Sequence, residues 1–135
     1  MADASRPGDN RHTSSLVALD LRTGALVWSY QQVPHDRWGY DVASSPVLLD
    51  VTVKGMRVPA VAQASKTGWV FVHDRRDGHL LFKSEPFVPQ RNLFTPPQPG
   101  EGVVIAPGIG GGANWSPSAY DPTRQLFFVG ALHLP

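Results

Sequence analysis

The 135-residue chain contains no cysteine. It therefore forms no disulfide, has no thiolate metal site and carries no haem attached through a Cys-x-x-Cys-His motif. Its 12 basic and 11 acidic residues leave a formal net charge of +1. Because no run of basic residues stands out, electrostatics give no support for nucleic-acid binding.

Long apolar runs and helical periodicity are also missing. No apolar run approaches the ~20 residues of a membrane-spanning helix, and no segment keeps an apolar 3.6-residue period over roughly ten residues. The segment Met1–Ser5 lacks the apolar core of a signal peptide. Either the protein stays inside the cell or its leader lies upstream, and we expect the second. The chain is predicted to be all-β.

A repeated motif is the clearest feature that the chain does have. Residues 18–28 (ALDLRTGALVW) are echoed by residues 72–82 (VHDRRDGHLLF) and more weakly by residues 119–128 (AYDPTRQLFF). The aspartates of the three copies, Asp20, Asp74 and Asp121, are 54 and 47 residues apart. Each copy is an apolar strand, then Asp-x-x-x-Gly (Gln in the last), then a second apolar strand with an aromatic residue. This pattern predicts a β-hairpin whose turn needs Asp and Gly.

Hairpins that recur at this spacing are typical of the blades of a β-propeller. We expect an N-terminal loop at 1–14 and a partial propeller at 15–135, with blade segments of about 15–64, 65–106 and 107–135. A complete propeller has at least about four blades, so two and a half blades would leave open edges and apolar faces. The chain is thus interpreted as a fragment, or as a protein that associates with itself or with the missing blades. A small independent β-sandwich is the alternative.

Three loops hold the candidate functional residues. The polar segment 31–46 carries His35, Asp36, Trp38 and Tyr40, and loops of this composition often form binding sites. The segment 83–101 is rich in proline. The segment 108–112 has four glycines but no helical pattern after it, which excludes a dinucleotide fingerprint. It is either a flexible loop or a backbone that passes close to a flat ligand, with Trp115 as a stacking surface.

Several motifs, in order along the chain, resemble those of one family. Residues 34–41 (PHDRWGYD) are similar to its Pro-His-Asp-x-Trp-Asp-x-Asp loop, and residues 16–28 resemble its tryptophan-docking repeat, in which Trp28 packs between neighbouring sheets. Residues 66–78 resemble its Lys/Arg-x-Gly strand and turn, and residues 112–120 its cofactor loop. The family is that of the quinoprotein dehydrogenases, eight-bladed propeller enzymes that use pyrroloquinoline quinone (PQQ). The Lys-Thr-Gly sequence is more similar to the sugar and polyol branch than to the methanol branch.

The resemblance implies a division of roles. In the family PQQ accepts a hydride, a carboxylate takes the hydroxyl proton, a calcium or lanthanide ion polarises a carbonyl, and a cation stabilises the developing negative charge. By resemblance, Lys66 is the cation that contacts the quinone, and Asn114 and Trp115 belong to the cofactor loop. Asp41 matches a second acid that resembles a metal ligand in the lanthanide-using members.

One position departs from the family pattern. The first acid after the tryptophan is the family's general base, and here that position is Gly39, which cannot accept a proton. Either Asp41, two residues on, acts as base or metal ligand, or the base and the activity are lost. His35 and Asp36 are expected to fix the loop.

The resemblance implies a fragment of a PQQ-dependent dehydrogenase whose parent oxidises an alcohol, polyol or sugar in the periplasm and passes electrons to a quinone. Catalysis by this chain alone is not expected, because only part of the ring and of the metal ligands is present. The rival hypothesis is a non-enzymatic propeller scaffold. The two differ in whether Asp41, Lys66, Asn114 and Trp115 converge on one rim.

Overall fold

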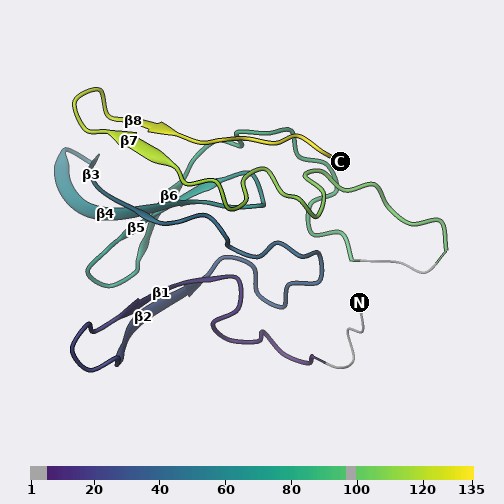
Figure 1. Ribbon diagram of the computed structural model, residues 1–135, viewed down its shortest axis with the longest axis horizontal. Helices are drawn as coiled ribbons and strands as arrows, with labels where there is room; N and C mark the ends of the chain where they lie inside the picture. Colours follow the sequence, from purple (N-terminus) through teal and green to yellow (C-terminus); the bar gives the residue numbers. More distant parts are fainter. Residues whose placement is uncertain (1–5, 97–99) are drawn as a thin grey trace.

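The computed structural model describes residues 6–96 and 100–135, and within these ranges all regular structure is β-strand, as expected (Figure 1). No helix in these ranges could cross a membrane. The strands are β1 (Ser15–Leu19), β2 (Leu26–Gln31), β3 (Val47–Val53), β4 (Met56–Ala64), β5 (Val70–Asp74), β6 (Leu80–Lys83), β7 (Ala119–Asp121) and β8 (Leu126–Phe128).

The strands form three antiparallel sheets in three layers. The middle layer is a four-stranded sheet of order β3-β4-β5-β6, and the hairpins β1-β2 and β7-β8 lie on its opposite sides (Figure 1). The middle sheet crosses the boundary predicted near residue 64, because β4 continues directly into pairing with β5. The sheets therefore differ in extent from the predicted segments. The middle sheet has four strands, and the sheet on each side of it has one hairpin.

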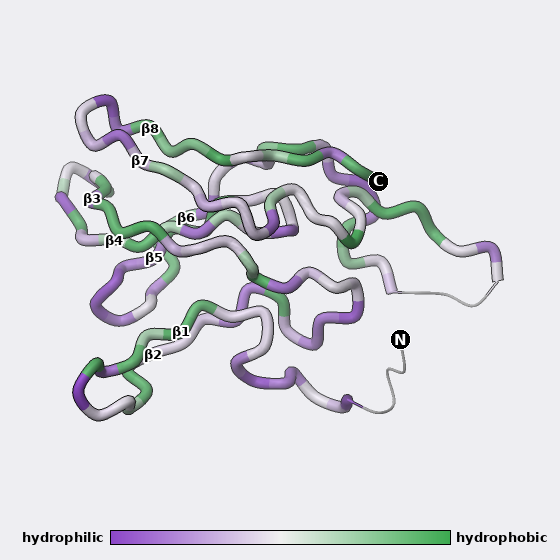
Figure 2. Tube along the Cα trace, in the orientation of Figure 1, coloured by the Kyte–Doolittle hydropathy of each residue, from purple (hydrophilic) through white to green (hydrophobic). Residues whose placement is uncertain are grey.

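The three predicted hairpins are present, and one kind of turn closes them. In each, the aspartate Oδ1 accepts hydrogen bonds from backbone N–H groups two or three residues later, at 2.9–3.1 Å, for Asp20, Asp74 and Asp121. The fifth residue has a positive φ in every case, 72° at Gly24, 76° at Gly78 and 55° at Gln125. Figure 2 shows the turns of β5-β6 and β7-β8 as hydrophilic.

Trp28 joins the first hairpin to the middle sheet. Its indole Nε1 donates to the backbone carbonyl of Arg75 at 3.1 Å, and its ring covers Gly78, where a Cβ would lie 2.6 Å from the indole. The neighbouring Tyr30 ring lies 4.4 Å from that of His73. Trp28 is thus between the sheets, as predicted, but it is half-buried rather than buried.

The third hairpin packs differently from the first two. The hydroxyl of Tyr120 on β7 donates to the backbone carbonyl of Asp50 on β3 at 3.4 Å, so β7-β8 lies against the first half of the middle sheet. A Ser-Pro pair precedes β3 at Pro46 and likewise precedes β7 at Pro117. The third copy therefore shares its turn with the other two but takes the position of a sheet's first hairpin. The Asp turn closes a hairpin without specifying which neighbour that hairpin contacts.

Candidate functional site

The loop between β2 and β3 is fixed by its own polar side chains. The Oδ1 atom of Asp36 accepts hydrogen bonds from the backbone N–H groups of Trp38 and Gly39, each at 3.0 Å. The buried Tyr40 donates its hydroxyl to the carbonyl of Pro107 at 2.6 Å, and its burial raises the pKa of the phenol. Asp36 therefore shapes the loop, in agreement with the role expected for it.

Aromatic side chains hold this loop against the proline-rich segment. Trp38 stacks on Tyr40 at 6.3 Å between ring centroids and meets the edge of Phe94 at 5.4 Å. The indole of Trp38 donates to the carbonyl of Thr95 at 2.7 Å, and Trp69 stacks on Phe94 at 6.4 Å. The aromatic residues of the loop were noticed in the sequence, but the part played by Phe94 was not, since nothing in a proline-rich segment indicates which loop it contacts.

Lys66 and Asp41, 25 residues apart in sequence, form an ion pair. The Lys66 Nζ lies 2.9 Å from the Asp41 Oδ1 and also donates to the carbonyl of Gly39 at 3.1 Å. The Lys66 side chain is only 8 % exposed, whereas that of Asp41 is 58 % exposed. A buried ammonium needs such partners because burial without them is costly. The structure therefore places two predicted site residues in direct contact.

The glycine-rich segment packs on this lysine. A Cβ on Gly111 would overlap the side chain of Lys66, and the N–H of Gly112 donates to the Lys66 carbonyl at 2.8 Å. The segment therefore makes its close approach to Lys66, and a backbone that also passes close to a flat ligand stays a prediction. Four glycines in a loop indicate a close approach of some kind, but only the fold identifies the partner.

The two remaining candidate residues, Asn114 and Trp115, differ in burial. The Nδ2 of Asn114 donates to the carbonyl of Gly110 at 3.1 Å, and its Oδ1 is buried without a hydrogen-bond partner. Trp115 is 77 % exposed. Asn114 thus lies on the segment that contacts Lys66 and carries an unused acceptor, while the structure leaves Trp115 on the surface.

These residues offer one shielded cation and acceptor oxygens, but no set of metal ligands. The Lys66 ammonium can donate a hydrogen bond to an oxygen of a quinone, whereas the buried Asn114 Oδ1 can only accept one from an N–H or O–H group. In contrast, no group of three or more His, Asp or Glu side chains among the described residues could hold a metal ion, and the Asp41 Oδ1 is already paired with Lys66. A calcium ion needs about six to eight oxygen ligands. The described residues therefore do not make a metal site by themselves.

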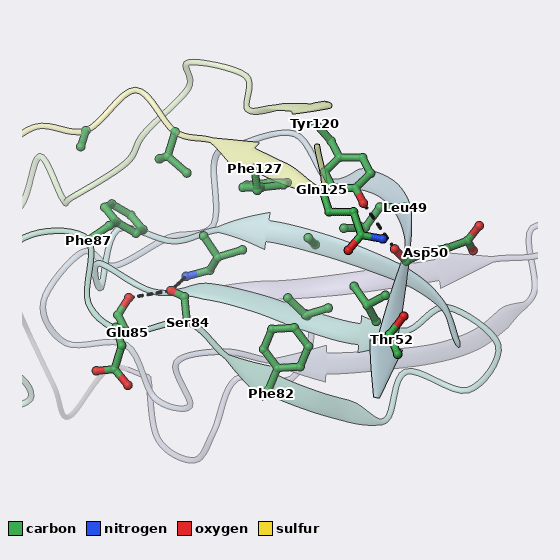
Figure 3. A pocket seen from close by; sticks show the side chains of 16 residues that line it. Leu49, Asp50, Thr52, Phe82, Ser84, Glu85, Phe87, Tyr120, Gln125 and Phe127 are labelled. Atoms are coloured by element: carbon green, nitrogen blue, oxygen red, sulfur yellow. Dashed lines mark hydrogen bonds between the residues drawn. The ribbon is translucent and has the colours of Figure 1, made fainter. Parts of the chain in front are cut away.

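A cavity lies elsewhere, between the middle sheet and β7-β8. It has a volume of about 600 Å³, and its walls are mainly apolar side chains of β3, β5, β6 and β8 (Figure 3). None of Asp41, Lys66, Asn114 and Trp115 lines it. The cavity is therefore separate from the ion pair.

Comparisons with known proteins agree on one family. Residues 1–93 match the family model described as "PQQ: Glucose/ethanol/alcohol dehydrogenase, beta-propeller domain". The chain is 39 % identical over 122 residues to quinoprotein glucose dehydrogenase of Escherichia coli K12, covering 85 % of this chain and 15 % of that protein. It is 32 % identical over 144 residues to quinoprotein alcohol dehydrogenase PedH of Pseudomonas putida, covering 92 % and 24 %.

Solved structures show the same relationship. The chain is similar to quinohemoprotein alcohol dehydrogenase ADHIIG of Pseudomonas putida HK5, with a TM-score of 0.81, 29 % identity, and coverage of 91 % of this chain and 20 % of that one. The chain is also similar to a europium-containing methanol dehydrogenase, with a TM-score of 0.77 and 28 % identity. This match covers 93 % of this chain and 24 % of that one. The chain thus spans between 15 % and 24 % of the length of these relatives. The fold class predicted from sequence, a partial β-propeller of quinoprotein type, is confirmed.

Proposed function

The chain belongs to the family of PQQ-dependent glucose, ethanol and alcohol dehydrogenases, and we propose that it carries part of the cofactor site of such an enzyme. The whole enzyme oxidises an alcohol, polyol or sugar in the periplasm and passes the electrons to a quinone acceptor. The similarity to a glucose dehydrogenase and the Lys-Thr-Gly sequence at residues 66–68 favour a sugar or polyol as the substrate.

The observation that carries this proposal is the Lys66–Asp41 pair. PQQ, when bound, supplies the hydride acceptor. The ammonium of Lys66 is held by Asp41 and the Gly39 carbonyl, and it would supply a fixed positive charge to stabilise the quinone oxygens of a bound PQQ. Asp41 is 58 % exposed, so its carboxylate can reach a substrate hydroxyl and take its proton. The buried Oδ1 of Asn114 offers a further hydrogen-bond acceptor.

Gly39 explains why the base is assigned to Asp41. Gly39 has a φ of 80°, and a Cβ there would lie 3.0 Å from Cγ1 of Ile109. An acid at position 39 would strain this loop, so the loop is built for glycine. A calcium or lanthanide ion, if the enzyme uses one, draws its other ligands from outside the described residues.

A chimaera tests the proposal. The matched segment of the Escherichia coli glucose dehydrogenase is replaced by this chain, and PQQ binding and glucose oxidation are measured. In a working chimaera, Lys66→Met should lower turnover by about 100-fold or more, as loss of one preorganised charge-stabilising group does. The exposed Lys54 provides the matched control, because Lys54→Met removes the same charge away from the ion pair. Equal effects of the two substitutions would refute the role of Lys66.

The glycine at position 39 also favours a second function, a propeller segment without catalysis. A chimaera that binds PQQ but does not turn over would show that Asp41 cannot replace the missing base. A chimaera that folds and fails to bind PQQ would instead support the scaffold hypothesis. In a chimaera that does turn over, Asp41→Asn should abolish turnover if Asp41 is the base.

A further inference from the structure

The segment 107–112 bridges the two parts of the chain that the ion pair joins. At one end, the carbonyl of Pro107 accepts a hydrogen bond from the hydroxyl of Tyr40 at 2.6 Å, which ties the segment to the loop between β2 and β3. At the other end, the N–H of Gly112 donates to the carbonyl of Lys66 at 2.8 Å, which ties it to the turn between β4 and β5. The segment therefore spans the interval across which the lysine reaches the loop.

The stem of Lys66 lies directly on the backbone of Gly111. A Cβ built on Gly111 would lie 2.5 Å from the Cβ of Lys66 and 2.6 Å from its Cα, closer than such atoms approach in proteins. Gly111 is also buried and has a φ of 75°, so glycine alone combines this conformation with this contact. A lysine stem is flexible in solvent, but here main-chain atoms confine it on one side. Its ammonium is therefore directed toward Asp41.

The same segment contacts an acceptor of the ammonium. A Cβ on Gly39 would lie 3.0 Å from Cγ1 of Ile109, so the isoleucine side chain lies against the backbone of Gly39. The carbonyl of Gly39 accepts the hydrogen bond from Lys66 at 3.1 Å. Ile109 is 67 % exposed and thus adds little to a buried core. The segment therefore touches both the stem of the lysine and the backbone that holds its charged end.

We propose that segment 107–112 positions the Lys66 ammonium against Asp41, with Gly111 and Ile109 as the positioning residues. Neither residue has a side chain that can carry a charge or a proton, so each acts through the lysine. Gly111 confines the stem, and Ile109 supports the loop that supplies the acceptors.

Confinement of the lysine matters for catalysis because the effect of a charge depends on its place. A preorganised charge stabilises a transition state without reorganising during the reaction, and a displacement of about 1 Å can lower the rate by about 100-fold. The inference rests on the proposed function for the catalytic use of Lys66. The placement of the lysine, in contrast, can be measured on the chain without PQQ.

Acetylation of the purified chain by acetic anhydride tests the placement. The chain has three lysines, Lys54, Lys66 and Lys83, so peptide mass spectrometry follows each amine separately. Lys66 should react about tenfold more slowly than the exposed Lys54, because its reaction needs a local opening of the packing. Gly111→Ala should remove most of this protection. Gly55→Ala is the matched control, since Gly55 has a φ of 78° and no atom within 4 Å of a Cβ built on it.

A second variant keeps the test decisive if Gly111→Ala does not fold. Ile109→Ala adds no atom and changes an exposed side chain, so it should alter the free energy of unfolding by no more than about 0.5 kcal/mol. It should nevertheless raise the acetylation rate of Lys66. Val104→Ala is its control, because Val104 is a similarly exposed apolar residue, at 59 %. An Ile109→Ala chain whose Lys66 stays as protected as in Val104→Ala would overturn the proposal.

Kinetics of the chimaera separate positioning from a merely structural role. Ile109→Ala should lower kcat per bound PQQ by about 10-fold and leave KM for glucose unchanged, because a misplaced charge weakens the transition state rather than substrate binding. Val104→Ala should have no such effect, and an equal fall in both variants would overturn the proposal. Faster acetylation of Lys66 with unchanged turnover would support the placement and refute the catalytic role of Lys66 in the proposed function.

Discussion

Two turns of the same type should respond differently to the same substitution. Gly24 and Gly78 occupy the fifth position of their Asp turns with φ values of 72° and 76°. Around Gly24 a Cβ meets nothing within 4 Å, whereas at Gly78 it would lie 2.6 Å from the Trp28 ring. Gly24→Ala therefore measures the backbone cost alone, and Gly78→Ala measures that cost together with the clash.

The magnitudes follow from these two contributions. An alanine held at positive φ costs about 1–2 kcal/mol, which is the whole effect expected for Gly24→Ala. Forcing a methyl group into a packed contact costs a further ~1–3 kcal/mol, so Gly78→Ala should lower the free energy of unfolding by about 2–5 kcal/mol. In a Trp28→Ala background the clash is gone, and the cost of Gly78→Ala should fall to that of Gly24→Ala.

Urea unfolding at one protein concentration provides the assay. The double-variant cycle of Trp28 and Gly78 isolates their interaction. Equal costs at the two glycines, or a cycle with no coupling, would show that Trp28 does not dock on Gly78.

Three further predictions concern acid stability and the loop. Burial lowers the pKa of His73 below its ordinary value of 6.5. The unfolded chain therefore binds the proton first, and stability should fall as pH drops below about 6.5. In urea unfolding, His73→Phe should make the free energy of unfolding depend less on pH in this range. Hydrogen bonds from Arg76 hold the pKa of Asp74 at about 2, below 3.8. The resulting stability is present above about pH 4 and lost toward about pH 2, so acid titration followed by circular dichroism should show Arg76→Ala unfolding at higher pH. Gly39→Asp should lower the free energy of unfolding by about 1–2 kcal/mol through its positive φ, and further through a clash with Ile109. In thermal unfolding, Ile109→Ala should remove only the contribution of the clash. Full recovery of stability would show that the positive φ carries no cost.

The sequence alone was enough for local structure. The Asp-x-x-x-Gly spacing predicted three hairpins, because an aspartate that accepts turn N–H groups and a glycine that tolerates positive φ act within a few residues of each other. The loop motifs indicated the family for the same reason, since each is a short continuous run. The residues of the ion pair, Asp41 and Lys66, were both singled out in this way.

Only the tertiary structure decided how these pieces meet. It placed Lys66 against Asp41 and Gly111, and it seated the third hairpin on β3 rather than on β5 and β6. It also left Phe82 and Leu19 44 % and 59 % exposed. A turn sequence encodes the closure of a hairpin through contacts a few residues apart. Which face of which sheet that hairpin covers depends on packing between residues tens of positions apart, and no local pattern in the chain records it.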